Sequence, residues 1–220
     1  MNKNVSIAIT AALVMNGGIV NAQEATNIGK HNITLSKDVM TPETLWAMGR
    51  IGSAQASPDG NKIVYQVGYY SVKENRGHQV ICVMDSDGQN VRQLTTSAKS
   101  EGSPVWLDNH TIAFLLDGQI WSMNSDGTNR KKLSSSDIEI EGFRFSPDGK
   151  KVLLIKSIPY YGTIKKNPSD LPKASGRLIT DMNYRHWDHY VETIAHPFVA
   201  EVTANGISKN DVDIIEGEPY

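Results

Sequence analysis

The sequence has almost no cysteine and no long cluster of basic residues, which excludes disulfide-rich proteins and argues against nucleic-acid-binding proteins. Its 220 residues hold a single cysteine, Cys82, so an internal disulfide is excluded and the fold depends on its hydrophobic core. Cys82 lies in the apolar run 80–84, where a small buried side chain is expected rather than a reactive thiol. The longest run of Lys and Arg is the three residues 130–132 and the net charge is −2, so binding of a polyanion such as nucleic acid is not expected.

The N-terminus carries the one apolar stretch that resembles a targeting segment. Lys3 precedes residues 5–14, which are apolar apart from two polar residues, and small residues stand before a cleavage site that ends at Ala22. The stretch is shorter than the roughly 20 residues of a membrane-spanning helix. This favours a secretory signal peptide, residues 1–22, over a membrane anchor. We therefore expect an exported protein, in the periplasm of a Gram-negative bacterium, with no membrane attachment after cleavage.

Residues 23–52 are expected to form a leader that contains one short helix. Thr41 can cap this helix, Pro42 suits its first position, and Gly49 can end it. The apolar side of the helix would be made by Leu45, Trp46 and Met48.

The remaining sequence is repetitive. Ser-Pro-Asp-Gly at residues 57–60 recurs at residues 146–149, with a degenerate copy at residues 106–109. Asp-Ser-Asp-Gly at residues 85–88 recurs as Asn-Ser-Asp-Gly at residues 124–127. Asx-Gly pairs supply the positive φ that tight turns between strands require. A period near 40 residues with four short strands in each unit is typical of a β-propeller blade.

The second unit shows the expected blade most clearly. Its strands are predicted at residues 104–107, 111–115, 119–123 and 130–133, with Asp117-Gly118 joining the second to the third. The second and third strands are apolar on both faces, as strands between neighbouring blades should be. The fourth strand is polar, as expected at the outer edge of a blade.

These patterns predict an all-β chain that forms a partial β-propeller, an incomplete propeller over residues 53–220. Its three four-stranded, WD-like or TolB-like blades would span about residues 53–97, 103–136 and 142–216, and the third would be interrupted by an insertion at about 157–196. Three blades do not close a propeller, which typically has four to eight. We therefore expect the chain to be the N-terminal part of a longer protein, or a truncated reading frame.

Several segments resemble the propeller of the prolyl oligopeptidase family of serine peptidases. The resemblance is carried by Met40–Trp46 followed by Gly49–Gly52, by Leu171–Arg177, and by Tyr184–Asp188 with Phe198–Val202. Within the family, these segments are most similar to the bacterial dipeptidyl-peptidase V and acylaminoacyl-peptidase branch. The resemblance covers nearly all of the chain after the predicted signal peptide.

The resemblance implies a two-domain enzyme without a cofactor. A propeller would admit short peptides, and a C-terminal α/β-hydrolase domain would release dipeptides or acylated residues from their N-termini. This chain departs from that pattern because it holds no Gly-x-Ser-x-Gly nucleophile motif; Gly52-Ser53 and Gly102-Ser103 place the serine one position too early. No catalytic residue can be carried over, so the chain as given is expected to be inactive. The alternative function is a TolB-like propeller that acts as a periplasmic protein-binding module.

One polar and aromatic cluster in the insertion allows three interpretations. It can be a loop that faces the substrate or another domain, a metal site, or a loop packed on its own blade with Trp187 as anchor. The metal interpretation would use His186, Asp188 and His189, but their spacing matches no common zinc motif, and no metal is expected. The residues of the proposed substrate- or domain-facing loop are Tyr184, Arg185, His186, Trp187 and Asp188.

Overall fold

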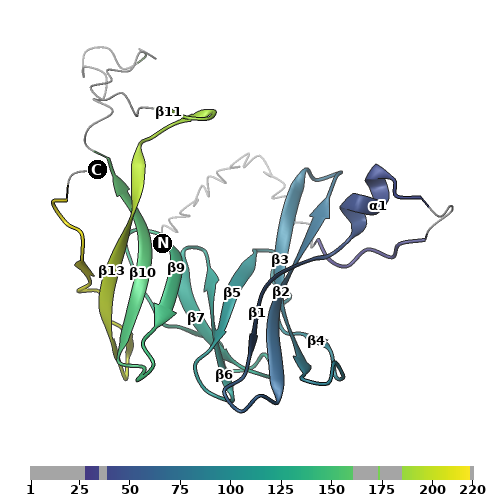
Figure 1. Ribbon diagram of the computed structural model, residues 1–220, viewed down its shortest axis with the longest axis horizontal. Helices are drawn as coiled ribbons and strands as arrows, with labels where there is room; N and C mark the ends of the chain where they lie inside the picture. Colours follow the sequence, from purple (N-terminus) through teal and green to yellow (C-terminus); the bar gives the residue numbers. More distant parts are fainter. Residues whose placement is uncertain (1–27, 35–38, 161–172, 174–184, 219–220) are drawn as a thin grey trace, which may run out of the picture.

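The computed structural model describes residues 28–34, 39–160, 173 and 185–218 (Figure 1). In this part of the chain, three antiparallel sheets follow one another along the sequence and stand side by side. The predicted signal peptide, its cleavage site after Ala22, and Tyr184 lie outside the described residues.

The first sheet has the strand order β1-β2-β3-β4. Its strands are β1 (Arg50–Ala56), β2 (Lys62–Ser71), β3 (Arg76–Asp85) and β4 (Arg92–Gln93). β2 and β3 are ten residues long each and pair along their whole length, so the hairpin of the first blade is longer than that of the second. β1 begins inside the segment 23–52 that was predicted as leader, because it pairs with the lengthened β2.

The second sheet repeats this order with shorter strands. They are β5 (Glu101–Trp106), β6 (Thr111–Leu116), β7 (Gln119–Asn124) and β8 (Lys131–Lys132). Each overlaps a strand predicted from the sequence. The β6–β7 connection is the predicted Asp117-Gly118 turn, and both of its residues have positive φ, 50° and 63°.

The third sheet is built around the hairpin of β10 (Lys151–Pro159) and β13 (Thr193–Thr203), with β9 (Ile140–Phe145) on the inner side. Both hairpin strands extend a few residues into the insertion predicted at about 157–196. Their pairing runs from Lys151↔Glu201 to Pro159↔Thr193. The outer edge of the sheet is formed by two short strands that pair with β13, β14 (Gly206–Ile207) and β15 (Val212–Asp213). Between β10 and β13 lies a separate hairpin, β11 (Arg185–His186) and β12 (His189–Tyr190).

One short helix, α1 (Pro42–Ala47), precedes the first sheet. Thr41 caps it as predicted, because its hydroxyl accepts a hydrogen bond from the Thr44 amide at 3.3 Å. The helix ends before Gly49, and that glycine serves packing rather than capping: a Cβ there would lie 2.8 Å from Cε1 of Tyr69. Within the described ranges, no helix is long and apolar enough to cross a bilayer.

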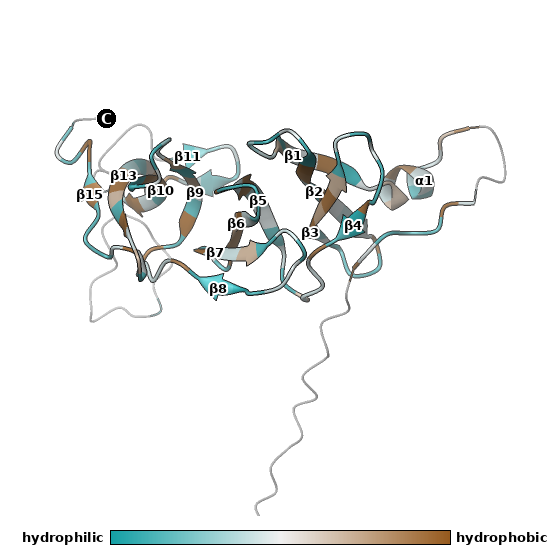
Figure 2. Cartoon of the chain, turned by 90° about the horizontal axis from the view of Figure 1, so that it is seen from below, coloured by the Kyte–Doolittle hydropathy of each residue, from teal (hydrophilic) through white to brown (hydrophobic). Residues whose placement is uncertain are grey.

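Two of the clusters of buried hydrophobic residues lie between neighbouring sheets (Figure 2), and a third, made by Val67, Val80 and Cys82, lies on the first sheet alone. One face of β6 presents Ile112 and Phe114 to the first sheet, and the other presents Ala113 to the third. The outermost strand β8 consists of two exposed lysines. The predicted fold class is therefore confirmed: the chain is a mostly-β, partial propeller of stacked sheets, although the third sheet has five strands rather than four.

A buried ion pair braces the second blade. The Glu101 side chain is 1% exposed and is paired with Arg130, which reaches it across the ring of Phe114. A second Arg130–Glu101 contact measures 3.4 Å, and the Ser97 hydroxyl donates to Glu101 at 3.1 Å. Both carboxylate oxygens of Glu101 therefore have partners, and removing Arg130 would leave the buried charge with only the Ser97 hydroxyl as a donor.

Replacing Arg130 by Met is expected to lower the free energy of unfolding by about 3 kcal/mol, the typical cost of breaking a buried pair from one side. Urea denaturation of the protein would measure the change. Lys99→Met is the matched control, because it removes the exposed Lys99–Asp117 pair, which is worth at most about 1 kcal/mol. Equal losses in the two variants would contradict a bracing role for Arg130.

His78 on β3 makes stability depend on pH. Its side chain is 1% exposed, and neither ring nitrogen has a hydrogen-bond partner among the described residues. Burial lowers the pKa of His78, the nearby Arg76 lowers it further, and Glu101 opposes both effects. The unfolded chain therefore takes up a proton below about pH 6.5 that the folded chain resists, so stability is lost as the pH falls.

His78→Phe is expected to reduce the loss of stability between pH 8 and pH 5, because the aromatic ring fills the site without a titrating group. Urea denaturation at the two pH values would measure it, with His110→Gln as the control at an exposed histidine. An unchanged pH dependence in His78→Phe would show that other groups cause the acid sensitivity.

Candidate functional site at the upper rim

The elements that break the blade repeat stand at one end of the sheets. The starts of β1, β5 and β9 lie at the same end as the β2–β3, β6–β7 and β10–β13 connections, as shown by the pairs Arg50↔Gly68, Glu101↔Leu116 and Lys156↔Ile140. We call this end the upper rim. It carries α1, the tip of the β2–β3 hairpin and the β11–β12 hairpin (Figure 1).

The opposite end, the lower rim, is formed by the repeated turns. In the first turn the Ser57 hydroxyl donates to Asp59 at 2.6 Å and accepts from the Lys62 amide at 2.9 Å. The hydrogen bond from Ser57 is the main cause that lowers the pKa of Asp59. Ser146 and Asp148 repeat this geometry in the third blade. These serine and aspartate side chains are committed to turn formation.

The β11–β12 hairpin projects from the third blade and presents Trp187 at its tip. The indole is 88% exposed, and Trp187 has a positive φ of 55°, which is uncommon for a bulky residue. Arg185 stabilises the turn by donating from Nε to the Trp187 carbonyl at 3.1 Å. The interpretation in which Trp187 anchors the loop on its own blade is therefore wrong, because this side chain contacts little of the protein.

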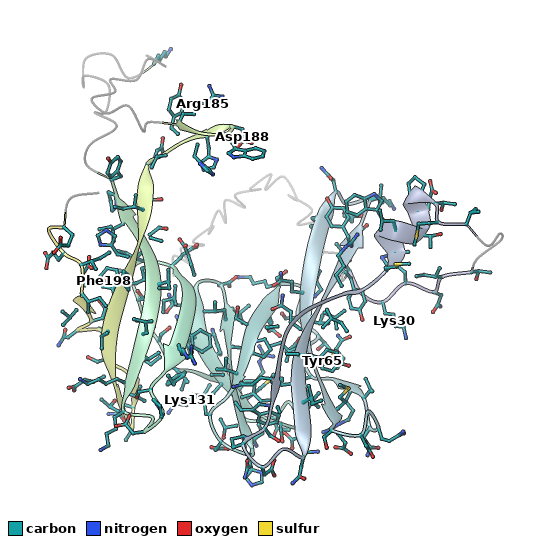
Figure 3. All side chains as sticks on the ribbon, in the orientation of Figure 1. Lys30, Tyr65, Lys131, Arg185, Asp188 and Phe198 are labelled. Atoms are coloured by element: carbon teal, nitrogen blue, oxygen red, sulfur yellow. The ribbon has the colours of Figure 1, made fainter. Side chains whose placement is uncertain are left out.

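Polar and aromatic side chains flank this tip. His189 Nδ1 lies 3.1 Å from Asp188 Oδ1, and this hydrogen bond is the main cause that lowers the pKa of Asp188. The rings of His186 and His189 meet edge to face at 5.6 Å. Figure 3 shows Arg185 and Asp188 away from the body of the blade. Among the residues the structure describes, no group of three His, Cys, Asp or Glu could hold a metal ion.

Another His–Asp pair lies inside the third blade. His196 Nδ1 is 2.7 Å from Asp213 Oδ2, and these side chains are only 6% and 11% exposed. Beside it, Lys156 pairs with Asp211 at 2.7 Å. Both aspartates belong to the β15 segment, so the two pairs attach the outer strand to the hairpin β10–β13.

In the described part of the chain, two pockets open on the upper rim beside the first blade, and Tyr70 lines both of them. The first, which we call the aromatic pocket, has a volume of about 450 Å³ and lies between α1 and the β2–β3 hairpin. Its wall includes Trp46 and Tyr70, whose rings stack at 4.6 Å. Pro42, Ala47 and Val72 complete its apolar lining.

The second, which we call the Arg50 pocket, has a volume of about 320 Å³ and faces the second blade. Gly68 leaves part of its floor without a side chain, the Tyr70 ring lies beside Gly77, and Arg50, Gln79 and Ser100 stand around the pocket. Sequence reasoning missed both pockets. The available signal was the pair of glycines inside a long strand hairpin, where glycine often marks a close approach of another group.

Comparison with known proteins gives a consistent result. No protein-family profile matches the chain. Dipeptidyl-peptidase 5 of Porphyromonas gingivalis is 39% identical over 225 residues, covering 100% of this chain and 31% of that protein. Dipeptidyl-peptidase 5 of Porphyromonas endodontalis is 36% identical over 192 residues, covering 85% of this chain and 28% of that protein. The chain thus spans about a third of the length of these relatives.

Solved structures agree on the fold. Pyrococcus horikoshii acylaminoacyl peptidase matches 77% of this chain and 26% of its own, with a TM-score of 0.55 at 13% identity. An acylaminoacyl peptidase in complex with Z-Gly-Gly-Phe-chloromethyl ketone matches 74% of this chain and 24% of its own, with a TM-score of 0.53 at 12% identity. At such identities the likeness concerns the fold alone.

Proposed function

We propose that this chain is an N-terminal propeller part of the dipeptidyl-peptidase 5 and acylaminoacyl-peptidase branch of the prolyl oligopeptidase family, and that it admits peptides to a secreted dipeptidyl peptidase. The catalytic serine, aspartate and histidine would lie in an α/β-hydrolase domain outside these 220 residues. The substrates would be short peptides, from whose N-termini dipeptides are released, and no cofactor is required. The observation that carries the proposal is the match along the whole chain to dipeptidyl-peptidase 5.

The upper rim is the surface that we assign to substrate admission. α1, the long β2–β3 hairpin and the β11–β12 hairpin stand there, whereas Ser57 and Ser146 on the lower rim use their hydroxyl groups inside turns. Trp187 supports this assignment, because an 88% exposed indole is costly in water and aromatic side chains are favoured where a protein meets a partner. With α1 and the two hairpins standing on it, the upper rim would admit short, extended peptides and exclude folded proteins.

The natural protein that contains this chain is expected to hydrolyse dipeptidyl 4-nitroanilides and to be inactivated by a serine-directed reagent. Trp187→Ala should change the rate on long peptides relative to the dipeptidyl substrate by about tenfold, as expected for one aromatic contact worth 1–2 kcal/mol. Val91→Ala on the lower rim, also an exposed apolar side chain, is the matched control.

Two outcomes would contradict this proposal separately. Absence of dipeptidyl hydrolysis would remove the peptidase assignment and favour the protein-binding module. Hydrolysis with the same length dependence in Trp187→Ala and the natural protein would leave the peptidase but remove the role of the hairpin tip.

Secretion is the second part of the proposal and rests on residues 1–22. The mature protein is expected in the periplasmic fraction with its N-terminus at Gln23, the residue after Ala22. N-terminal peptide mass spectrometry of the purified protein would measure this. A cytoplasmic protein that retains Met1 would refute it.

A further inference from the structure

Arg50 stands at the start of β1 and is held from two sides. Its Nη2 donates to the carbonyl of Leu45 at 3.2 Å, which satisfies an acceptor at the end of α1. Its guanidinium carbon lies 5.2 Å from the centre of the Trp46 ring, within the range of a cation–π contact. Among the described residues Arg50 forms no ion pair, so a guanidinium fixed in place keeps most of its five N–H donors uncommitted.

Other donors surround the Arg50 pocket. The Ser100 hydroxyl accepts from the Gln79 amide at 3.1 Å, which leaves its own proton free to donate. The side-chain oxygen of Gln79 points toward Gly102, since a Cβ on that glycine would lie 2.7 Å from it. The Gln79 side-chain NH₂ group makes no hydrogen bond to the described residues, so it can donate to a ligand. No aspartate or glutamate among the described residues lines this pocket, so its donors meet no anion there.

The floor of the pocket admits a ligand close to the backbone. Gly68 pairs with Gln79, and Gly77 pairs with Tyr70, so both glycines share the face that looks toward the second blade. A Cβ at Gly68 would meet a single atom within 4 Å, the Arg50 carbonyl oxygen at 3.8 Å. The first blade therefore has an open, donor-lined hollow where its long hairpin rises above the shorter second blade.

We propose that the Arg50 pocket binds a carboxylate of the peptide substrate, in the first place its C-terminal carboxylate. Planar guanidinium groups bind carboxylates with two parallel hydrogen bonds, and amide and hydroxyl donors complete the set. The neighbouring aromatic pocket, which shares Tyr70 with the Arg50 pocket, suits the apolar side chain of the same terminal residue. The side chain and the carboxylate of a terminal residue share one Cα, which matches two adjoining pockets.

This inference rests on the proposed function, because it assigns the pocket to the peptide substrate. The same chemistry can come from a second source, the side chain of Asp or Glu within the peptide. Amidation of the peptide's C-terminus removes the first source and leaves the second, so it lowers binding only if the pocket takes the C-terminal carboxylate.

The test uses the natural protein that contains this chain and pentapeptides made as free acid and as C-terminal amide. We expect the amide to have a kcat/KM at least about tenfold lower, the usual effect of losing a charge-assisted hydrogen-bond pair. Arg50→Gln should bring the free acid to the level of the amide, and Arg50→Lys should retain part of the difference. Hydrolysis of dipeptidyl 4-nitroanilides, which have no carboxylate, should not change.

Two further variants separate this effect from a change in folding. Gln79→Leu removes an exposed donor of the pocket and leaves Arg50 in place, so it should lower the acid-to-amide ratio in the same direction. Arg92→Gln removes an exposed guanidinium near the lower rim and should leave the ratio unchanged. Calorimetric binding of the same peptides to protein treated with a serine-directed reagent provides a measurement that does not depend on turnover.

Each outcome has one meaning. A difference between Glu-containing and Gln-containing amidated peptides that Arg50→Gln abolishes would support the carboxylate site and assign it to side chains. Equal binding of free acid and amide, together with equal binding of the Glu and Gln peptides, would overturn the proposal. Loss of dipeptidyl hydrolysis in the unmodified protein would refute the proposed function, while the binding measurement would still decide whether the pocket takes a carboxylate.

Discussion

The second blade depends on both of its neighbours, because its middle strands bury apolar side chains on both faces. Phe114 and Ile112 pack toward the first sheet, whereas Ala113, between them in the sequence, packs toward the third. Removing either neighbouring sheet would expose one of these faces to water, at roughly 25 cal/mol per Å² of apolar surface. The stacking of whole sheets is therefore the condition under which the individual strands are stable.

This dependence explains which parts of the fold could be predicted. Turns such as Asp117-Gly118 are local, because positive φ is a property of the residues themselves, and they fix where strands of the second blade begin and end. The lengths of the β2–β3 and β10–β13 hairpins are not local. They are set by cross-strand pairing, which continued to Ser71↔Arg76 in the first blade and to Pro159↔Thr193 in the third.

The candidate site was harder to predict because it also depends on pairing between strands that are distant in the sequence. Arg50, Gln79 and Ser100 come from separate segments and meet only because pairing brings them to one level of the first blade. The sequence did indicate that residues 185–188 differ from a blade, yet it left open whether Trp187 is buried or exposed. That depended on whether the β11–β12 hairpin folds back onto the blade or projects from it, which no residue pattern decides.

The two rims differ in how far their polar groups are already used. On the lower rim, the carboxylates of Asp59 and Asp148 accept hydrogen bonds from Ser57 and Ser146 within the same turns, so little capacity remains for a ligand. On the upper rim, Arg50 and the side-chain NH₂ group of Gln79 retain donors that no described residue uses, and Trp46, Tyr70 and Trp187 provide apolar surface. Repetition in a propeller marks what every blade needs in order to fold. α1, the β2–β3 hairpin and the β11–β12 hairpin do not repeat, and they carry polar and aromatic side chains that do not take part in folding. Ligand binding should therefore be sought on these elements.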